Sequence, residues 1–221
     1  MSRELVRIGR EIEACEHCRR LRDYCAEVAR TKRRAYLDWE YWGRPVAGFG
    51  DPRARVFILG LAPGAHGANR TGRVFTGDKS GDWLYRALWQ TGFANQPTSR
   101  DREDGLELRD AWLSASVRCA PPDNKPLREE IAACRPFLER ELAAMPQVRV
   151  VVALGRLAFD NYLAGRRLGF VFAHDAEYHL PGEGEPILIS SYHPSQQNTS
   201  TGKLTEPMLR AVFERARRLI G

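Results

Sequence analysis

The sequence predicts an α/β fold of three layers, in which a four-stranded, mostly parallel sheet carries helices on both faces. Four short apolar runs, at 55–61, 111–117, 148–154 and 186–191, are typical of strands, and helical patterns lie between them. The third run is nearly continuous in β-branched residues, as expected for a strand buried on both faces. Loops bent by glycine and proline follow the first and last runs, where the carboxyl ends of parallel strands meet.

The remaining elements are expected in order along the chain. Charged, helix-forming sequence at 3–13 and 19–38 flanks a Cys-x-x-Cys knuckle, and a polar, glycine-rich loop at 64–77 follows the first strand. No repeat, low-complexity tract or linker interrupts the sequence, so residues 1–221 are predicted to form a single domain with an N-terminal cysteine-bearing extension. Further helices are expected at 81–91, 127–144, 155–163 and 205–220, and a hairpin-like region at 170–181.

Charge and composition limit the classes of function. The formal net charge is +6 at pH 7, from 30 arginines and four lysines against 28 acids. The planar fork of arginine binds phosphate in a bidentate manner, so this balance permits a nucleic-acid partner, although a GC-rich genome would produce the same bias. No apolar run approaches the roughly 20 residues that span a membrane, and the first residues do not resemble a secretory signal. We therefore expect a cytoplasmic protein.

Five cysteines raise the question of a metal centre. An odd number without a secretory signal argues against a disulfide framework. Cys15 and Cys18 have the spacing of two thiolates on one centre, while Cys119 and Cys134 form a looser pair. A structural zinc usually uses two tight pairs, whereas a four-thiolate iron–sulfur cluster accepts looser spacing, so zinc, a cluster and four unrelated buried cysteines all remain open. Cys25 has no partner at a meaningful spacing and is expected to be a small core residue.

The loop after the first predicted strand is one candidate wall of a site. Pro63 and Gly64 form a tight turn that would let the backbone N–H groups of Ala65 and His66 approach a ligand closely, or would simply connect a strand to a helix. Phe75 closes this loop, either as a ring that stacks on a flat base or as a hydrophobic plug. The sequence does not separate these alternatives.

Two titratable side chains lie at the predicted loops. His193 follows the last strand and precedes Pro194, which favours an extended backbone and directs the imidazole to the crevice. There it could donate a hydrogen bond to a developing oxyanion, although a lone histidine is more often structural. Asp78 is the carboxylate close behind the first loop, and it could orient a water, accept a proton or cap the following helix.

Taken together, these features resemble the uracil-DNA glycosylase superfamily. Its first active-site motif is similar to Gly60–Gly64 followed by Arg73–Gly77, and its second is similar to His193–Ser195. The resemblance covers nearly the whole chain, up to about Thr205. The cysteine pattern is similar to that of the iron–sulfur branches, whose cluster ligands match Cys15, Cys18, Cys119 and Cys134.

Within the superfamily the chain resembles family 5 (type B). Leu61 stands where family 4 has a glutamate, and Ala115 stands where family 4 has an asparagine. In the relatives, the missing groups are tied to water activation and tight selection of uracil. The resemblance therefore implies a broader range of substrates.

The resemblance implies a fold, a reaction and a cofactor. The fold is uracil-DNA glycosylase-like, and the activity is that of a monofunctional glycosylase that initiates base excision repair. It would excise uracil, and other deaminated or modified bases, by base flipping and hydrolysis of the N-glycosidic bond. A structural 4Fe–4S cluster is implied on the four matched cysteines. We expect a monomer with damaged DNA as its partner, no membrane partner, and association with the nucleoid when bound to DNA.

Roles for single residues follow from the same resemblance. Phe75 would stack on the flipped base and Asn124 would read its edge, in a pocket whose backbone is supplied by Ala62–Ala65. His193 would donate to the base oxygen, and Asp78 would assist the attacking water. A polar segment would fill the gap in the duplex and contact DNA, through Ser195, Gln196, Gln197, Asn198 and Lys203.

Two other functions remain open at this point. A non-catalytic iron–sulfur protein of the same fold that binds nucleic acid would explain Leu61 and Ala115. A small-molecule hydrolase or transferase could use the same crevice without phosphate contacts. The glycosylase interpretation requires the turn at Pro63 and the imidazole of His193 to face each other across one slot.

Overall fold

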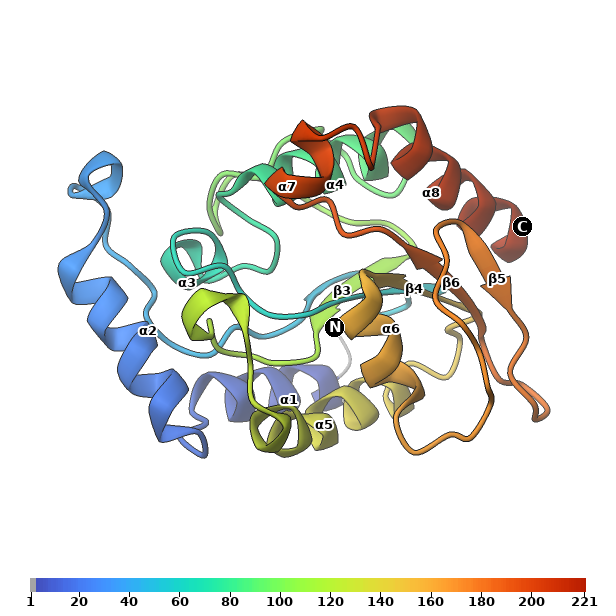
Figure 1. Cartoon of the computed structure of the whole chain (residues 1–221), viewed down its shortest axis with the longest axis horizontal. Helices are drawn as coiled ribbons and strands as arrows, with labels where there is room; N and C mark the ends of the chain where they lie inside the picture. Colours follow the sequence, from blue (N-terminus) through green and yellow to red (C-terminus); the bar gives the residue numbers. More distant parts are fainter. Residues whose placement is uncertain (1–2) are drawn as a thin grey trace.

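Six strands form one sheet in the order β1-β3-β2-β4-β6-β5 (Figure 1). The structure, a computed structural model, describes residues 3–221. The three-layer α/β fold and the four predicted parallel strands are confirmed. These central strands are β2 (Val56–Gly60), β3 (Ala111–Ala115), β4 (Val150–Leu154) and β6 (Ile187–Ser191).

The predicted number of strands, four, is wrong because two short antiparallel strands extend the sheet. β1 (Phe49–Gly50) pairs with β3 at one edge, and β5 (Ala176–Tyr178) pairs with β6 at the other. Both are half-buried, and both are too short to show an alternating pattern. The hairpin-like region expected at 170–181 contributes β5.

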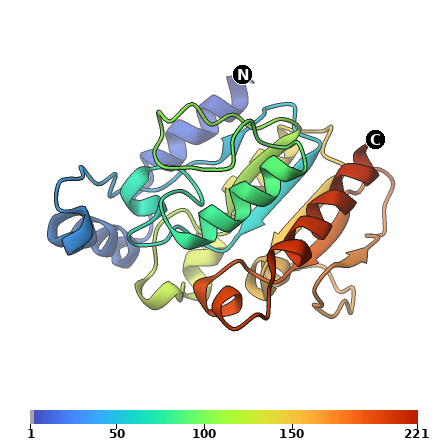
Figure 2. The same ribbon diagram turned by 90° about the horizontal axis from the view of Figure 1, so that it is seen from above.

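The two faces of the sheet are covered by different helices. Val56 and Ile58 of β2 pack into one apolar cluster with α4 (Lys79–Gln90) and α8 (Glu206–Ile220). The alternate residues of β2, Phe57 and Leu59, pack into a second cluster on the opposite face. Figures 1 and 2 show this arrangement of layers. The helices of the second face are α1 (Arg3–Glu13), α5 (Arg128–Ala143) and α6 (Arg156–Leu163).

The N-terminal extension differs from its prediction. α2 (Arg19–Thr31) ends well before residue 38, because Lys32 adopts left-handed backbone with φ 55°. A single 3₁₀ turn, η1 (Arg34–Tyr36), follows it. Three short helical segments lie in regions predicted as loops, because none is long enough to carry an apolar face: α3 (Ala68–Thr71), η2 (Pro122–Asn124) and α7 (Gln196–Ser200).

In the part of the chain that the structure describes, no helix combines the length and the apolar character that a bilayer span requires.

Candidate active site

A cleft of about 970 Å³ opens at the carboxyl ends of the parallel strands. The turn at Pro63 forms part of its lining, and so does His193, so the spatial requirement of the glycosylase interpretation is met. Most of the predicted site residues line this cleft: Ala62, Pro63, Gly64, Ala65, Phe75, Asp78, Asn124, His193, Ser195, Gln196 and Gln197.

Two predicted DNA contacts, Asn198 and Lys203, are not among the lining residues. The Asn198 side-chain amide donates to the His193 carbonyl at 2.8 Å, so this residue holds the histidine loop in place. The Lys203 ammonium lies 4.7 Å from the centre of the Tyr192 ring. A contact of either residue with DNA stays a prediction.

Phe75 and His193 face each other inside the cleft. Their rings are stacked, with centroids 5.9 Å apart and planes inclined by 30°. The Phe75 ring also lies directly over the end of β2, since a Cβ added at Gly60 would stand 2.6 Å from its Cζ atom. Glycine at this position is therefore what lets the aromatic ring reach the histidine.

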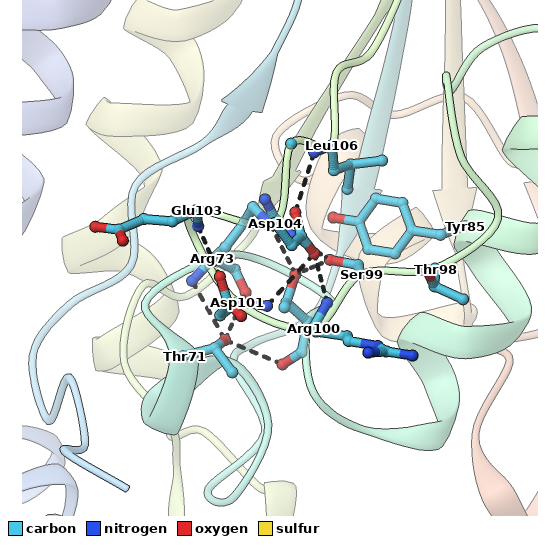
Figure 3. A network of polar contacts seen from close by, with 12 residues as sticks. Thr71, Arg73, Tyr85, Thr98, Ser99, Arg100, Asp101, Glu103, Asp104 and Leu106 are labelled. Carbon is cyan, nitrogen blue, oxygen red and sulfur yellow. Dashed lines mark hydrogen bonds and ion pairs between the residues drawn. The ribbon is translucent and has the colours of Figure 1, made fainter.

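A buried polar network fixes the turn that carries Phe75 (Figure 3). The Arg73 guanidinium lies 2.7 Å from the Asp104 carboxylate and donates to the Ser99 hydroxyl at 2.7 Å. The Ser99 and Thr76 hydroxyls are 2.6 Å apart. Loss of one partner of such a buried pair typically costs about 3–5 kcal/mol. The network joins the loop that carries Ser99 and Asp104 to the turn, and no sequence pattern predicts this contact.

Asp78 caps a helix and also presents a carboxylate oxygen to the first loop. Its Oδ1 caps α4 by accepting the Gly81 N–H at 3.0 Å. Its Oδ2 lies against the first loop, where a Cβ added at Gly64 would stand 2.8 Å from it. Burial raises the pKa of Asp78, and hydrogen bonds from the Gly81 and Ser80 N–H groups oppose this effect. A carboxylate with a raised pKa is a stronger base than an exposed aspartate, which suits it to accept a proton inside a cleft.

The imidazole of His193 is neutral at physiological pH, because burial lowers its pKa to about 4. A neutral imidazole retains one N–H donor. It can therefore donate a hydrogen bond to an anion that forms in the cleft without first exchanging a proton with solvent.

The rim of the cleft combines predicted residues with others that no sequence pattern indicates. The predicted Asn124 and its neighbour Asp123 adopt consecutive left-handed conformations, with φ 56° and 53°, and both line the cleft. His66, whose backbone was expected to approach a ligand, reaches the cleft from the loop after β2. Arg33 and Tyr36 reach it from the N-terminal extension, and no local pattern connects that extension to the cleft.

The four cysteines predicted as ligands come from three separate parts of the fold. Cys15 and Cys18 lie between α1 and α2, Cys119 follows β3, and Cys134 is on α5, as expected. All are free thiols, and Cys18 packs against the cluster that buries Cys119 and Cys134. Cys25 is buried in the same cluster, and its thiol donates to the Ala120 carbonyl at 3.6 Å, so its prediction as a core residue is confirmed.

The predicted cysteine ligands are thiols whose ionisation the fold disfavours. Burial, followed by the charges of Cys134, Glu130 and Cys15, raises the pKa of Cys18 to about 11. Burial also raises the pKa of Cys134, with Cys15 adding to it. These thiols are therefore neutral at physiological pH, and a cationic centre would be required to hold them as thiolates.

Within residues 3–221, no three His, Cys, Asp or Glu side chains are grouped as ligands of a single metal ion. Each thiolate of a four-iron cluster binds its own iron, so the sulfurs stand further apart than the ligands of one ion. A four-iron cluster would therefore not require such a group.

Comparison with known proteins agrees with this geometry. Residues 47–217 match the family model of the uracil DNA glycosylase superfamily. The chain is 50% identical to the type-5 uracil-DNA glycosylase of Thermus thermophilus over 95% of both chains. It is 46% identical to that of Mycobacterium leprae, over 97% of this chain and 95% of the relative. It is 48% identical to that of Mycobacterium tuberculosis, over 95% of this chain and 80% of the relative.

Proposed function

The chain belongs to the uracil-DNA glycosylase superfamily, and from that membership we infer how its cleft excises uracil from DNA. The resemblance to family 5 is confirmed by the type-5 relatives. The protein is a hydrolase that cleaves the N-glycosidic bond. The observation that carries the mechanism is the stacking of the Phe75 and His193 rings in one cleft with the half-buried side chain of Asp78.

We propose that the damaged nucleotide is flipped out of the duplex into this cleft. Flipping costs a few kcal/mol, and less for a mismatched base such as deaminated cytosine. Phe75 stacks on the flipped base, and Asn124 reads its edge from the rim. Gln196 and Gln197, at the start of α7, occupy the side of the cleft next to His193 and would fill the gap in the stack.

The chemical step uses the neutral imidazole of His193 and the carboxylate of Asp78, whose pKa is raised by burial. The C1′–N1 bond breaks with its electron pair on the base, and the neutral imidazole of His193 donates to the base oxygen that gains charge. The water oxygen bonds to C1′, and its proton passes to Asp78. Burial makes that carboxylate a stronger base than an exposed aspartate.

The substrate range is proposed to extend beyond uracil. Leu61 and Ala115 both line the cleft, so two positions that are polar in family 4 are apolar in this chain. An apolar wall rejects related bases weakly, since it leaves no buried polar group unpaired when the base changes. Other deaminated or modified bases are therefore proposed as substrates.

The function is tested by incubating the protein with duplex oligonucleotides that contain uracil opposite guanine. We expect strand breaks only after alkali, because a monofunctional glycosylase leaves an intact abasic strand. The matched duplex with cytosine in place of uracil should stay uncut. Binding of the uracil duplex without cleavage would favour a non-catalytic protein, and binding insensitive to salt would favour a small-molecule enzyme.

We propose that Cys15, Cys18, Cys119 and Cys134 hold a 4Fe–4S cluster. When bound, the cluster supplies structural cross-linking and no step of the hydrolysis. It would join the N-terminal extension to α5, which carries Cys134. The packing of Cys18 against the cluster that buries Cys119 and Cys134 supports this assignment.

The cluster assignment predicts a difference between two neighbouring cysteines. Cys119→Ala should lose the visible iron–sulfur absorbance and melt at a lower temperature, because the extension loses its cross-link. Cys25→Ala is the matched control, since Cys25 is buried beside Cys119 and should leave the iron content unchanged. Iron analysis and absorbance measure both; a wild-type protein without iron that is fully active would contradict the assignment.

The oligomeric state, the domain organisation and the cellular location are proposed from the same function. We propose a monomer, because the cleft is complete within one chain. We also propose a single domain with the cysteine-bearing extension, acting in the cytoplasm on the nucleoid.

A further inference from the structure

One side of the cleft is built by residues that the hydrolysis does not use. The segment 32–41 of the N-terminal extension lies beyond the end of α2, at the upper left of Figure 1. It brings Arg33 to the cleft, where His66 also lies. We propose that Arg33 and His66 form a phosphodiester-binding site that holds the DNA strand next to the flipped nucleotide. This inference rests on the proposed function.

The segment is held in a fixed position before any ligand binds. The Arg70 guanidinium lies 3.9 Å from the ring centre of Tyr36 and 4.0 Å from that of Trp39. Arg70 is itself buried and donates to the His66 carbonyl at 2.8 Å. A guanidinium packed against two rings stabilises the segment against the loop after β2. Arg33 is therefore presented to the cleft by an ordered support.

A hydrogen bond joins Tyr41 to the ring of His66. The Tyr41 hydroxyl lies 3.0 Å from His66 Nδ1. Burial raises the pKa of Tyr41, so the hydroxyl keeps its proton, and the backbone N–H of Arg33 partly opposes this rise. In the proposed site this hydroxyl donates to Nδ1. His66 is then left with an N–H donor at Nε2.

The charge of this region favours an anion. Burial, and then the charges of Arg33 and Arg70, lower the pKa of His66, so the imidazole donates while neutral. Among residues 3–221, Arg33 forms no ion pair, whereas Arg30 pairs with Glu27 at 2.7 Å. An unpaired arginine fork beside an N–H donor matches the two non-bridging oxygens of a phosphodiester.

The position of Arg33 separates the proposed phosphodiester site from the part of the cleft that is proposed to bind the base. The base is proposed to lie between the first loop and His193, while Arg33 is exposed and comes from the extension. An exposed cation at the mouth of a cleft that takes a flipped nucleotide lies where the backbone must pass. Contacts of this kind fix the strand without reading its sequence.

The test measures affinity separately from cleavage, with a duplex that carries a tetrahydrofuran abasic site. Arg33→Gln should weaken binding about tenfold and reduce the slope of log affinity against log salt by about 0.9. Tyr41→Phe should weaken binding with an unchanged slope, because it releases the tautomer of His66 without removing a charge. Arg34→Gln is the matched control, with the same charge change one residue away, and should bind as the wild type does.

Single methylphosphonate linkages, placed in turn on either side of the lesion, identify the phosphate. The loss caused by Arg33→Gln should disappear at one linkage only. Equal losses for Arg33→Gln and Arg34→Gln at every linkage would overturn the proposal, as would wild-type binding by Arg33→Gln. Failure of the wild type to excise uracil would overturn the proposed function instead, and thermal melting confirms that each variant is folded.

Discussion

Replacing His193 by alanine should slow single-turnover excision of uracil by about 10²- to 10³-fold, the usual cost of removing one oxyanion donor. The affinity for a duplex with a tetrahydrofuran site should change little, because the imidazole acts on charge that appears only as the bond breaks. Rapid-quench measurement of cleavage, together with equilibrium titration of the duplex, gives both quantities.

His193→Gln is the matched control for this prediction. The amide of glutamine retains an N–H donor without a titratable ring, so it should recover part of the lost rate. Equal loss of binding and of cleavage in His193→Ala would contradict the role in the transition state. Because the pKa of His193 is about 4, its contribution to the rate should also be constant between pH 5 and pH 8.

The parts of the fold that could be predicted are those with a repeating local pattern. The run at 148–154 predicts β4 because a strand buried on both faces needs apolar residues throughout. β1 has two residues and β5 three, so their places in the sheet depend on their partners, Leu113 and Ser190 among them. The end of α2 could not be predicted either, since a single left-handed residue, Lys32, sets it.

The residues of the candidate site likewise fall into those that a local pattern predicts and those that it does not. Pro63, Phe75 and His193 belong to short motifs that a sequence displays directly. Their supports do not, because Arg73 and Asp104 are 31 residues apart and Tyr41 and His66 are 25 apart. No pattern in one segment indicates a partner in the other. Contacts within a motif can therefore be predicted here, whereas the residues that hold the motif in place are found only in the folded chain.

Asp78 is placed so that one residue could serve both of the roles that the sequence left open. Helix capping engages one carboxylate oxygen, with Gly81, and leaves the other oxygen at the first loop. Asp78→Asn separates the two functions, because asparagine is as good an N-cap as aspartate but is not a base. We expect α4 to remain folded and single-turnover cleavage to slow by about 10²- to 10⁴-fold.

The pH dependence of cleavage gives the sharper test of Asp78. The carboxyl group must be ionised to accept a proton, and burial raises its pKa, so the wild-type rate should fall with decreasing pH well above the range of an exposed aspartate. His193 stays neutral down to about pH 4, so a loss above that pH belongs to Asp78.

The contribution of Asp78 to the stability of the fold should change with pH in the opposite direction to the cleavage rate. A raised pKa means that the folded state holds the proton more tightly than the unfolded chain, so this group destabilises the fold as pH rises and the carboxylate ionises. Asp78→Asn removes that effect, and its gain in stability over the wild type should therefore be larger at neutral pH than at pH 4. If Asp78→Asn keeps the fall in rate at low pH, the proton transfer belongs to another group. If the variant loses that fall and also shows the larger gain in stability at neutral pH, the chemistry depends on the burial of this one carboxylate.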